Sequence, residues 1–306
     1  MPSAIQTPSY LIVTPVRNEG LHFHQTVEAV VSQTARPSAW IIVDDGSSDI
    51  TPQVIDAAAS QHSWIQAVHR LDRGFRKQGG GVIEAFYAGF HHVEGLAWDF
   101  VVKMDGDLSF PSNYFEECLR RFSLDPQLGI GGGRVYCCVN GKCIEDSPGD
   151  PAFHVRGATK IYRRATWQAI GGLVRAVGWD TLDEVKANML GWKTYSFPDL
   201  RVLQLKPTGV ADGSWKNWFK NGRANYIAGY HPLFMLAKCL KRTVEPPYGI
   251  AALGLLTGFA TAYLKRVRQV QDRELIKYVR RQQLNRLTFR ESLWDQRPRA
   301  CEAHQT

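Results

Sequence analysis

The first half of the chain alternates short apolar runs with segments of helical periodicity. The apolar runs predict strands at 10–16, 39–47, 64–70 and 98–107. The segments between them, at 20–34, 49–61 and 79–93, repeat apolar residues every three to four positions and predict helices. Strands that alternate with helices at this interval imply right-handed crossovers. We therefore expect an α/β fold, a Rossmann-like and mostly parallel sheet flanked by helices.

After Pro111 the pattern is less regular. It predicts strands at 128–138, 158–164 and 194–205, and helices at 114–123 and 180–190 with a short one at 165–172. These strands are expected to extend the same sheet with mixed directions.

From Ser214 the chain becomes basic and aromatic, which suggests a catalytic domain at 1–213 and a mainly helical C-terminal region at 214–306. The formal net charge is +8, and the second region alone holds 17 Lys and Arg against 6 Asp and Glu. An anionic partner is expected, which leaves nucleic acid, anionic lipid and a phosphorylated substrate as candidates.

The apolar stretch Ile250–Leu264 has 15 residues and is too short to span a bilayer as a helix, which takes about 20. Two interpretations remain: an anchor that lies on a membrane surface, or a helix that packs on the protein or on another subunit.

The N-terminus lacks the pattern of a secretory signal, so a cytoplasmic protein is expected, with attachment to the inner face of the cytoplasmic membrane as one alternative. The six cysteines lack zinc-site spacing and are interpreted as reduced thiols.

Polar residues follow three of the predicted strands, in PVRNEG at 15–20, DDGSSD at 44–49 and DGDLS at 105–109. Ligands of parallel sheets bind outside the carboxyl ends of the strands, so these clusters are expected to meet at one edge.

Asp105 and Asp107 flank Gly106, and in extended backbone their side chains point the same way. Such a pair suits a divalent cation, Mg²⁺ or Mn²⁺, that completes its shell with substrate phosphates; the alternative is a polar turn. Asp44 or Asp45 is placed to accept hydrogen bonds from a nucleobase or ribose. Ser47, Ser48 and Asp49 are candidates to cap the next helix.

TPVRNEG, WIIVDDGSSD and KMDGDLSF, in this order, resemble the inverting family-2 glycosyltransferases of the GT-A fold, of the type that builds bacterial cell-surface polysaccharides. The resemblance covers Tyr10 to Gly209. It implies that the first acidic cluster binds the base and ribose of a nucleotide sugar, and that the D-x-D motif holds a cation on the diphosphate. The residues assigned to the nucleotide sugar are Pro15, Arg17, Asn18, Glu19, Asp44, Asp45, Lys77, Asp105, Gly106 and Arg223, with Asp105 and Asp107 as metal ligands.

Two of these assignments, Lys77 and Arg223, lie outside the three strand-end clusters. Lys77, or Arg76, lies in the basic glycine-rich loop RGFRKQGGG that opens a predicted helix, where backbone N–H groups approach an anion. Arg223, in KNGRANY, loosely imitates the Gln-x-x-Arg-Trp motif of processive members and has the charge to neutralise a diphosphate leaving group.

The resemblance also implies an Asp general base, often in a Glu-Asp pair before a helix that ends in glycine and an aromatic residue. Counting back from Gly191 and Trp192 assigns Asp180, with Trp179 where the Glu usually stands. Asp183 is the second candidate, although Thr181 and Glu184 have capping-box spacing, which suits acids at the helix start. In HVRGATKIYRR, two interpretations of His154 and Arg156 are open: they face the acceptor or the diphosphate, or they are surface residues in ion pairs.

The expected function is metal-assisted transfer from a nucleotide-diphosphate sugar, a UDP-sugar by resemblance, to a hydroxyl of a glycan or a lipid-linked acceptor. The alternatives are a nucleotidyltransferase on a similar sheet and a non-catalytic sugar- or nucleotide-binding protein. No nucleic-acid partner is expected, because acidic strand ends repel a polyanion. An anionic membrane surface is the expected partner of the basic region.

Overall fold

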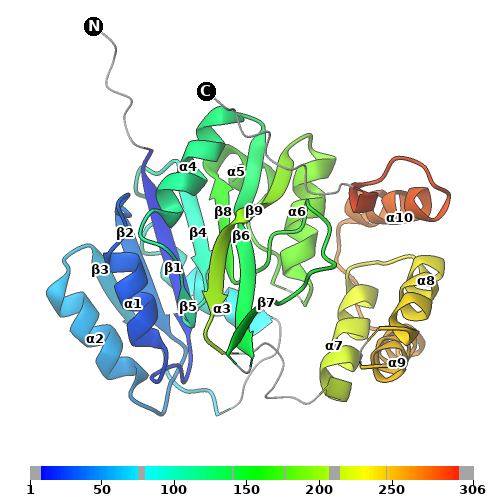
Figure 1. Cartoon of the computed structure of the whole chain (residues 1–306), viewed down its shortest axis with the longest axis horizontal. Helices are drawn as coiled ribbons and strands as arrows, with labels where there is room; N and C mark the ends of the chain where they lie inside the picture. Colours follow the sequence, from blue (N-terminus) through cyan, green and yellow to red (C-terminus); the bar gives the residue numbers. More distant parts are fainter. Residues whose placement is uncertain are drawn as a thin grey trace, which may run out of the picture.

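The computed structural model describes residues 8–74, 80–139, 141–175, 177–206, 214–245 and 247–295 (Figure 1). Its strands are β1 Tyr10–Val16, β2 Ala39–Asp44, β3 Ile65–His69, β4 Phe100–Met104, β5 Leu108–Ser109, β6 Leu128–Val139, β7 Lys142–Glu145, β8 Thr159–Arg163 and β9 Lys193–Gln204. Its α-helices are α1 Phe23–Val31, α2 Thr51–Gln61, α3 Gly80–Phe90, α4 Tyr114–Leu124, α5 Arg164–Ile170, α6 Trp179–Met189, α7 Ser214–Ile227, α8 Pro232–Thr243, α9 Ile250–Leu264 and α10 Arg273–Leu287.

The strands form one sheet in the order β3-β2-β1-β4-β8-β6-β9-β5, and β7 pairs with β6. The first four are parallel, as the alternation of strands and helices predicted. β8 then runs antiparallel to β4 and β6, while β6 and β9 are parallel. The α/β fold and the mixed extension of the sheet are therefore confirmed.

Helices cover both faces of the sheet (Figure 1). One core joins α1, α2 and α4 to the sheet, and a second core joins α3, α5 and α6 to the other face. Burial on both faces explains why β1, β2 and β4 are almost wholly apolar.

A third core lies between α6 and the helices α7 to α10, which stand beside the sheet (Figure 1). It includes Leu182 and Val185 of α6 and Leu255 and Phe259 of α9. The helical character predicted for the C-terminal region is observed, whereas its division from residues 1–213 as a separate domain stays a prediction.

α9 covers the predicted apolar stretch Ile250–Leu264 and packs closely against α7. A Cβ on Gly258 would lie 2.0 Å from the Phe219 carbonyl oxygen, and one on Gly222 would lie 2.1 Å from that of Leu255. Glycine is therefore required where the helices cross, and one face of α9 packs on the protein. Among the described helices, none has both the length and the apolar character needed to cross a bilayer.

Some local predictions were wrong in detail. β4 ends at Met104, three residues before the predicted boundary. α6 begins after Gly178 without a side-chain cap, so Thr181 and Glu184 form no capping box. α2 begins after Ile50, and of the three predicted caps Asp49 alone contacts its first turn, accepting from the Thr51 N–H at 2.9 Å. The short strands β5 and β7 had no clear sequence signal.

Candidate active site

The carboxyl ends of β1, β2 and β4 meet at one edge of the sheet, because these strands are parallel neighbours. The three polar clusters predicted from the sequence follow these ends and lie at this edge. The Asp107 carboxyl is close enough to Asp105 and Glu19 for both negative charges to raise its pKa. Residues from the first and third clusters are thus neighbours.

Asp44 closes β2 and is buried, with its carboxylate already in hydrogen bonds. One oxygen accepts from the Ser47 N–H at 2.8 Å, and the other lies 3.3 Å from His69 Nδ1. Asp45, next in the chain, pairs with Arg70 at 2.5 Å and with Arg73. These contacts shape the turn after β2 and hold the two carboxylates in place.

The residues that follow β1 interlock with this turn. Arg17 donates to the Asp45 carbonyl at 2.7 Å and pairs with Asp72 at 2.7 Å. Asn18 adopts a φ of 53°, and its side-chain oxygen accepts from the Ser48 N–H at 2.9 Å. Glu19 pairs with Lys206 at 3.0 Å. Pro15 lies within β1 opposite Val43 and is buried.

The D-x-D motif follows the end of β4 directly, as predicted. The Asp105 N–H donates to the Ala158 carbonyl at 2.8 Å, and the carboxylate of Asp105 pairs with Lys103. Asp107 is buried and accepts from Gln204 at 3.2 Å. A Cβ on Gly106 would lie 2.3 Å from a Val16 side-chain methyl, so the central glycine is required by packing against β1.

The two carboxylates fit a divalent cation. Burial, followed by the charges of Asp105 and Glu19, raises the pKa of Asp107 to about 7, so a cation bound nearby would stabilise the ionised carboxylate. Among the described residues, no group of three potential metal ligands forms a complete site. The arrangement suits Mg²⁺ or Mn²⁺, which take one or two carboxylates and fill the remaining positions with water and phosphate.

Asp180, in the first turn of α6, is half-buried. Within the described part of the chain, no residue donates a hydrogen bond to its carboxylate. Burial favours the neutral acid, but the charges of His154, Lys160, Arg156 and Lys103 outweigh it and lower the pKa of Asp180. The carboxylate is therefore held in its ionised form.

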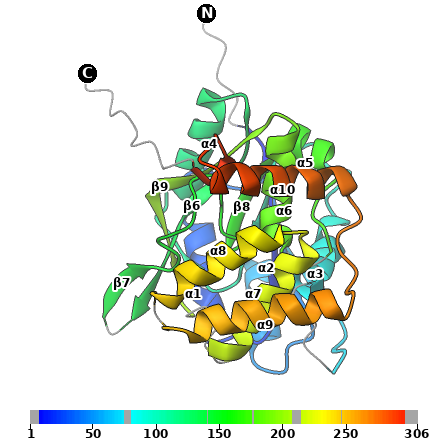
Figure 2. The ribbon, with the colours of Figure 1, turned by 90° about the vertical axis from the view of Figure 1, so that its right-hand side faces the viewer.

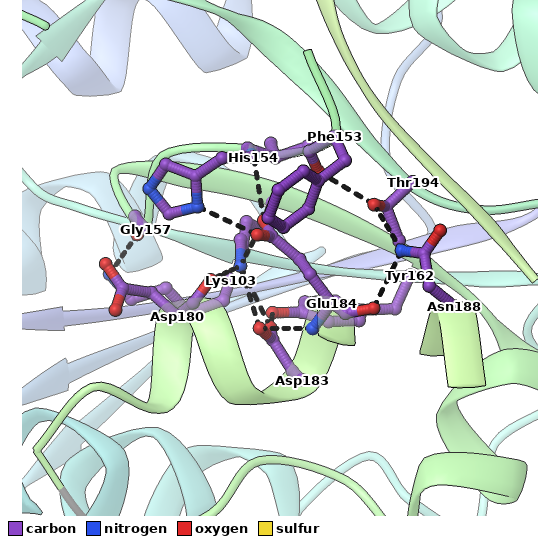
Figure 3. A network of polar contacts seen from close by, with 12 residues as sticks. Lys103, Phe153, His154, Gly157, Tyr162, Asp180, Asp183, Glu184, Asn188 and Thr194 are labelled. Atoms are coloured by element: carbon purple, nitrogen blue, oxygen red, sulfur yellow. Dashed lines mark hydrogen bonds and ion pairs between the residues drawn. The ribbon is translucent and has the colours of Figure 1, made fainter. Parts of the chain in front are cut away.

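Asp183 occupies a different environment (Figure 3). Its buried carboxylate accepts from Tyr162 at 2.5 Å and lies 3.0 Å from the Lys160 ammonium through both oxygens. Burial, only partly offset by Lys160, raises the pKa of Asp183 to about 6. Figure 3 shows the Asp180 carboxylate directed away from that of Asp183, so the two predicted base candidates do not face the same space.

Lys160 is the centre of this buried network and was not singled out from the sequence. Its ammonium also lies 2.7 Å from Glu184 and donates to the Asp180 backbone carbonyl. Strand alternation places Lys160 and Tyr162 on the same side of β8, facing α6. A lysine in the middle of a predicted strand, two residues before a tyrosine, was the signal available in the sequence.

Lys103 is a second buried lysine that sequence reasoning missed. It pairs with Asp105, donates to the Gly157 carbonyl at 2.5 Å and lies 5.2 Å from the centre of the Trp179 ring. Because its charge also lowers the pKa of Asp180, Lys103 joins the D-x-D motif to the start of α6. Trp179, where the family usually has Glu, thus packs against this ammonium.

Of the two basic candidates before β8, neither contacts the D-x-D motif. Arg156 pairs with Asp146 at 2.6 Å, and His154 Nδ1 lies 2.8 Å from the buried Glu184. Burial opposes the charge on His154, but Glu184, Asp150 and Asp180 raise its pKa to about 9.

The raised pKa of His154 predicts a pH-dependent stability. Protonated His154 stabilises the fold fully below its unfolded pKa of about 6.5, and this contribution is lost as pH rises through about 9. We expect His154→Gln to be less stable than wild type at pH 6 by up to about 3 kcal/mol, and the difference to shrink by pH 9.5. Urea unfolding across this range measures it. His91→Gln changes an exposed histidine and is the control, which should show the same dependence of stability on pH as wild type. A stability difference between wild type and His154→Gln that stays constant with pH would contradict the raised pKa of His154.

Arg223 lies on α7, which flanks the start of α6: a Cβ on Gly178 would lie 3.7 Å from the Ala224 carbonyl oxygen. With other aromatic and basic side chains it lines a cavity of about 490 Å³. The lining residues are Val177, Trp215, Lys216, Phe219, Lys220, Arg223 and Ile227. Lys77 and Arg76 lie outside the described residues.

A mixed sheet whose parallel strands gather carboxylates at their ends, one pair in a D-x-D motif, is typical of the GT-A glycosyltransferase fold. Residues 11–171, more than half of the chain, match the family described as Glycosyl transferase family 2. The chain belongs to this family.

Curated relatives agree with this assignment. The chain is 25% identical over 146 residues to Glycosyltransferase GlyG of Streptococcus pneumoniae serotype 4, covering 44% of this chain and 46% of the relative. It is 35% identical over 103 residues to the undecaprenyl-phosphate 4-deoxy-4-formamido-L-arabinose transferase of Serratia proteamaculans, covering 33% and 29%. The matches thus span less than half the length of these two relatives.

Solved structures share the fold at low identity. The mannosyltransferase PcManGT from Pyrobaculum calidifontis, in complex with GDP-Man and Mn²⁺, superposes with a TM-score of 0.54 and 18% identity over 94% of this chain and 77% of that one. TarS of S. aureus gives a TM-score of 0.52 at 15% identity over 84% and 43%. These likenesses confirm the GT-A fold.

Proposed function

We propose that the protein transfers a sugar from a nucleotide-diphosphate sugar to an acceptor hydroxyl, with inversion at the anomeric carbon and Asp180 as the general base. The observation that carries this proposal is the ionised, half-buried Asp180 carboxylate without a hydrogen-bond donor among the described residues, joined through Lys103 to the D-x-D edge. Asp183 is the weaker candidate because its carboxylate is buried and fully engaged.

The chemistry follows from these positions. Asp180 takes the proton of the acceptor hydroxyl as its oxygen attacks the anomeric carbon, and the bond to the diphosphate breaks. A divalent cation bound by Asp105 and Asp107 would neutralise charge on the departing diphosphate. We assign to Arg223, on the helix that flanks the start of α6, a second positive charge for the diphosphate.

The nucleotide is assigned to the strand ends. Asp44 and Asp45 are fixed after β2 by the Ser47 N–H and by Arg70. Their place beside Arg17, at the same sheet edge as the D-x-D motif, supports binding of base and ribose there. The donor is proposed to be a UDP-sugar; solved neighbours have been described in complexes with UDP and with GDP-Man.

The acceptor is proposed to be a glycan or a lipid-linked molecule, in polysaccharide synthesis at the inner face of the cytoplasmic membrane. Two features support this. The cavity beside Val177 has aromatic and basic walls suited to an amphiphilic anion, and one relative is named as an undecaprenyl-phosphate transferase.

Calorimetry tests the donor and the cation together. We expect one of UDP, GDP and CDP to bind with Mn²⁺ or Mg²⁺, and the binding to weaken at least tenfold, about 1.4 kcal/mol, with chelator or in Asp107→Ala. Asp125→Ala removes a surface carboxylate that pairs with Lys193 and should bind as wild type. If no nucleotide binds with either cation, the proposed function is wrong.

A further inference from the structure

The outer face of α8 and α9 carries a concentration of exposed apolar side chains. Among the described residues, ten of the 19 exposed large hydrophobic side chains lie between residues 233 and 264, about a tenth of the chain, so they are a patch and not a scatter. They are Leu233, Leu236, Leu240, Val244, Tyr248, Ile250, Leu253, Leu256, Tyr263 and Leu264.

These side chains belong to the outward faces of both helices. On α8 the exposed positions recur every three to four residues, while Met235 and Cys239 are buried. On α9, Leu255 and Phe259 point into the third core while Leu253 and Leu256 are exposed. Figure 2 shows α8 and α9 on the outside of the helical layer, with α7 behind them. The patch therefore faces away from the sheet.

The charge around the patch decides which partner fits. Residues 232–268 hold six Lys and Arg against one acid, Glu245. Lys241, Lys265, Arg266 and Arg268 are exposed at the ends of the two helices. A second copy of the chain docked through the same face would bring like charges together, whereas an anionic lipid surface complements them.

The length of the helices decides how they meet a bilayer. α9, with its 15 residues, is roughly 22 Å long at about 1.5 Å per residue, below the ~30 Å of a hydrocarbon core. It can lie in the interface and bury one face, and Tyr248 and Tyr263 have the amphipathic rings that favour the headgroup level.

We propose that the outer face of α8 and α9 docks the protein on an anionic lipid bilayer, with the apolar patch in the headgroup region and the Lys and Arg side chains on lipid phosphates. Membrane docking rests on the proposed function and deepens it, because it names the surface through which the enzyme meets the membrane. α9 packs directly on α7, whose residues, Arg223 among them, line the cavity. In the docked protein, only α9 would therefore separate α7 from the lipid.

Vesicle flotation of the whole chain tests the proposal. Wild type should float with vesicles of phosphatidylcholine and phosphatidylglycerol, less with phosphatidylcholine alone, and less again at high salt. Leu240→Glu/Leu253→Glu, at positions 63% and 56% exposed, should reduce the bound fraction at least tenfold. The control Leu96→Glu/Leu124→Glu adds the same charge at positions that are 46% and 71% exposed, after α3 and at the end of α4. This control should float as wild type does.

Two outcomes would overturn the proposal. One is flotation that is unaffected by Leu240→Glu/Leu253→Glu or by phosphatidylglycerol. The other is a wild-type dimer, seen by light scattering after size exclusion, that the same variant converts to a monomer while neither form floats. Nucleotide calorimetry without vesicles, on wild type and variant, separates the two proposals. If neither protein binds a nucleotide, the proposed function is refuted, while the flotation result still tests membrane docking.

Discussion

Asp180→Asn is expected to lower the rate of sugar transfer by about 10²- to 10⁴-fold, the usual contribution of a general base. The substitution keeps the size of the side chain and removes its ability to take a proton. Because no described residue donates a hydrogen bond to this carboxylate, the fold and the affinity for the nucleotide should be retained. Initial rates with a radiolabelled donor, alongside nucleotide calorimetry and thermal unfolding, measure all three.

Asp183→Asn is the matched control for the choice of base. It disturbs the contacts with Lys160 and Tyr162, so its main effect should be on stability, with activity per folded molecule within about tenfold of wild type. If Asp183→Asn abolishes transfer while Asp180→Asn remains active, the two roles are reversed. An acid limb in the pH–rate profile well above the ordinary aspartate range would also argue against Asp180, whose pKa is lowered by its cationic neighbours.

Lys160→Met should destabilise the protein by about 3–5 kcal/mol, because it leaves the buried Asp183 and Glu184 without the ammonium that they share. Methionine fills a similar volume, so the loss reports on charge and not on a cavity. The free energy of unfolding, from urea denaturation followed by tryptophan fluorescence, measures the effect.

The control is Lys193→Met, which removes a lysine 57% exposed in a surface pair with Asp125. We expect a change below about 1 kcal/mol there, since solvent screens such pairs. Comparable small losses at both positions would mean that the network around Lys160 contributes little. Adding Asp183→Leu to Lys160→Met should recover part of the stability, because the unpaired carboxylate is then removed as well.

The sequence predicted those parts of the site that depend on short segments and on topology. Asp44, Asp45, Asp105 and Asp107 follow apolar runs, and parallel neighbours necessarily bring such strand ends to one edge. The position of the D-x-D motif at the end of β4 was therefore predicted, although the packing demand on Gly106 from Val16 was not visible in the sequence.

The choice between Asp180 and Asp183 could not be made from the sequence. The two residues lie in the same first turns of α6, and what separates them is β8, about twenty residues earlier, which supplies Lys160 and Tyr162 to one carboxylate and leaves the other without a donor among the described residues. Hydrogen bonds between residues of different strands and helices leave no pattern in the local sequence.

Ile250–Leu264 illustrates the same limit. Its apolar composition predicted a helix with the observed bounds, but lipid and protein neighbours were equally compatible with it. The glycine contacts with α7 decide that one face packs on protein, and the exposure of Leu253 and Leu264 decides that the other does not.

The sequence by itself determined the alternation of strands and helices in the first half of the chain, the edge where the carboxylates gather and the excess of positive charge at the end of the chain. The tertiary structure decided which carboxylate is buried with a lysine, which has no hydrogen-bond donor among the described residues, and which side of α9 faces outward. The physical reason is that periodicity and charge are properties of neighbouring residues, whereas burial and pKa depend on side chains that meet only when distant segments pack together.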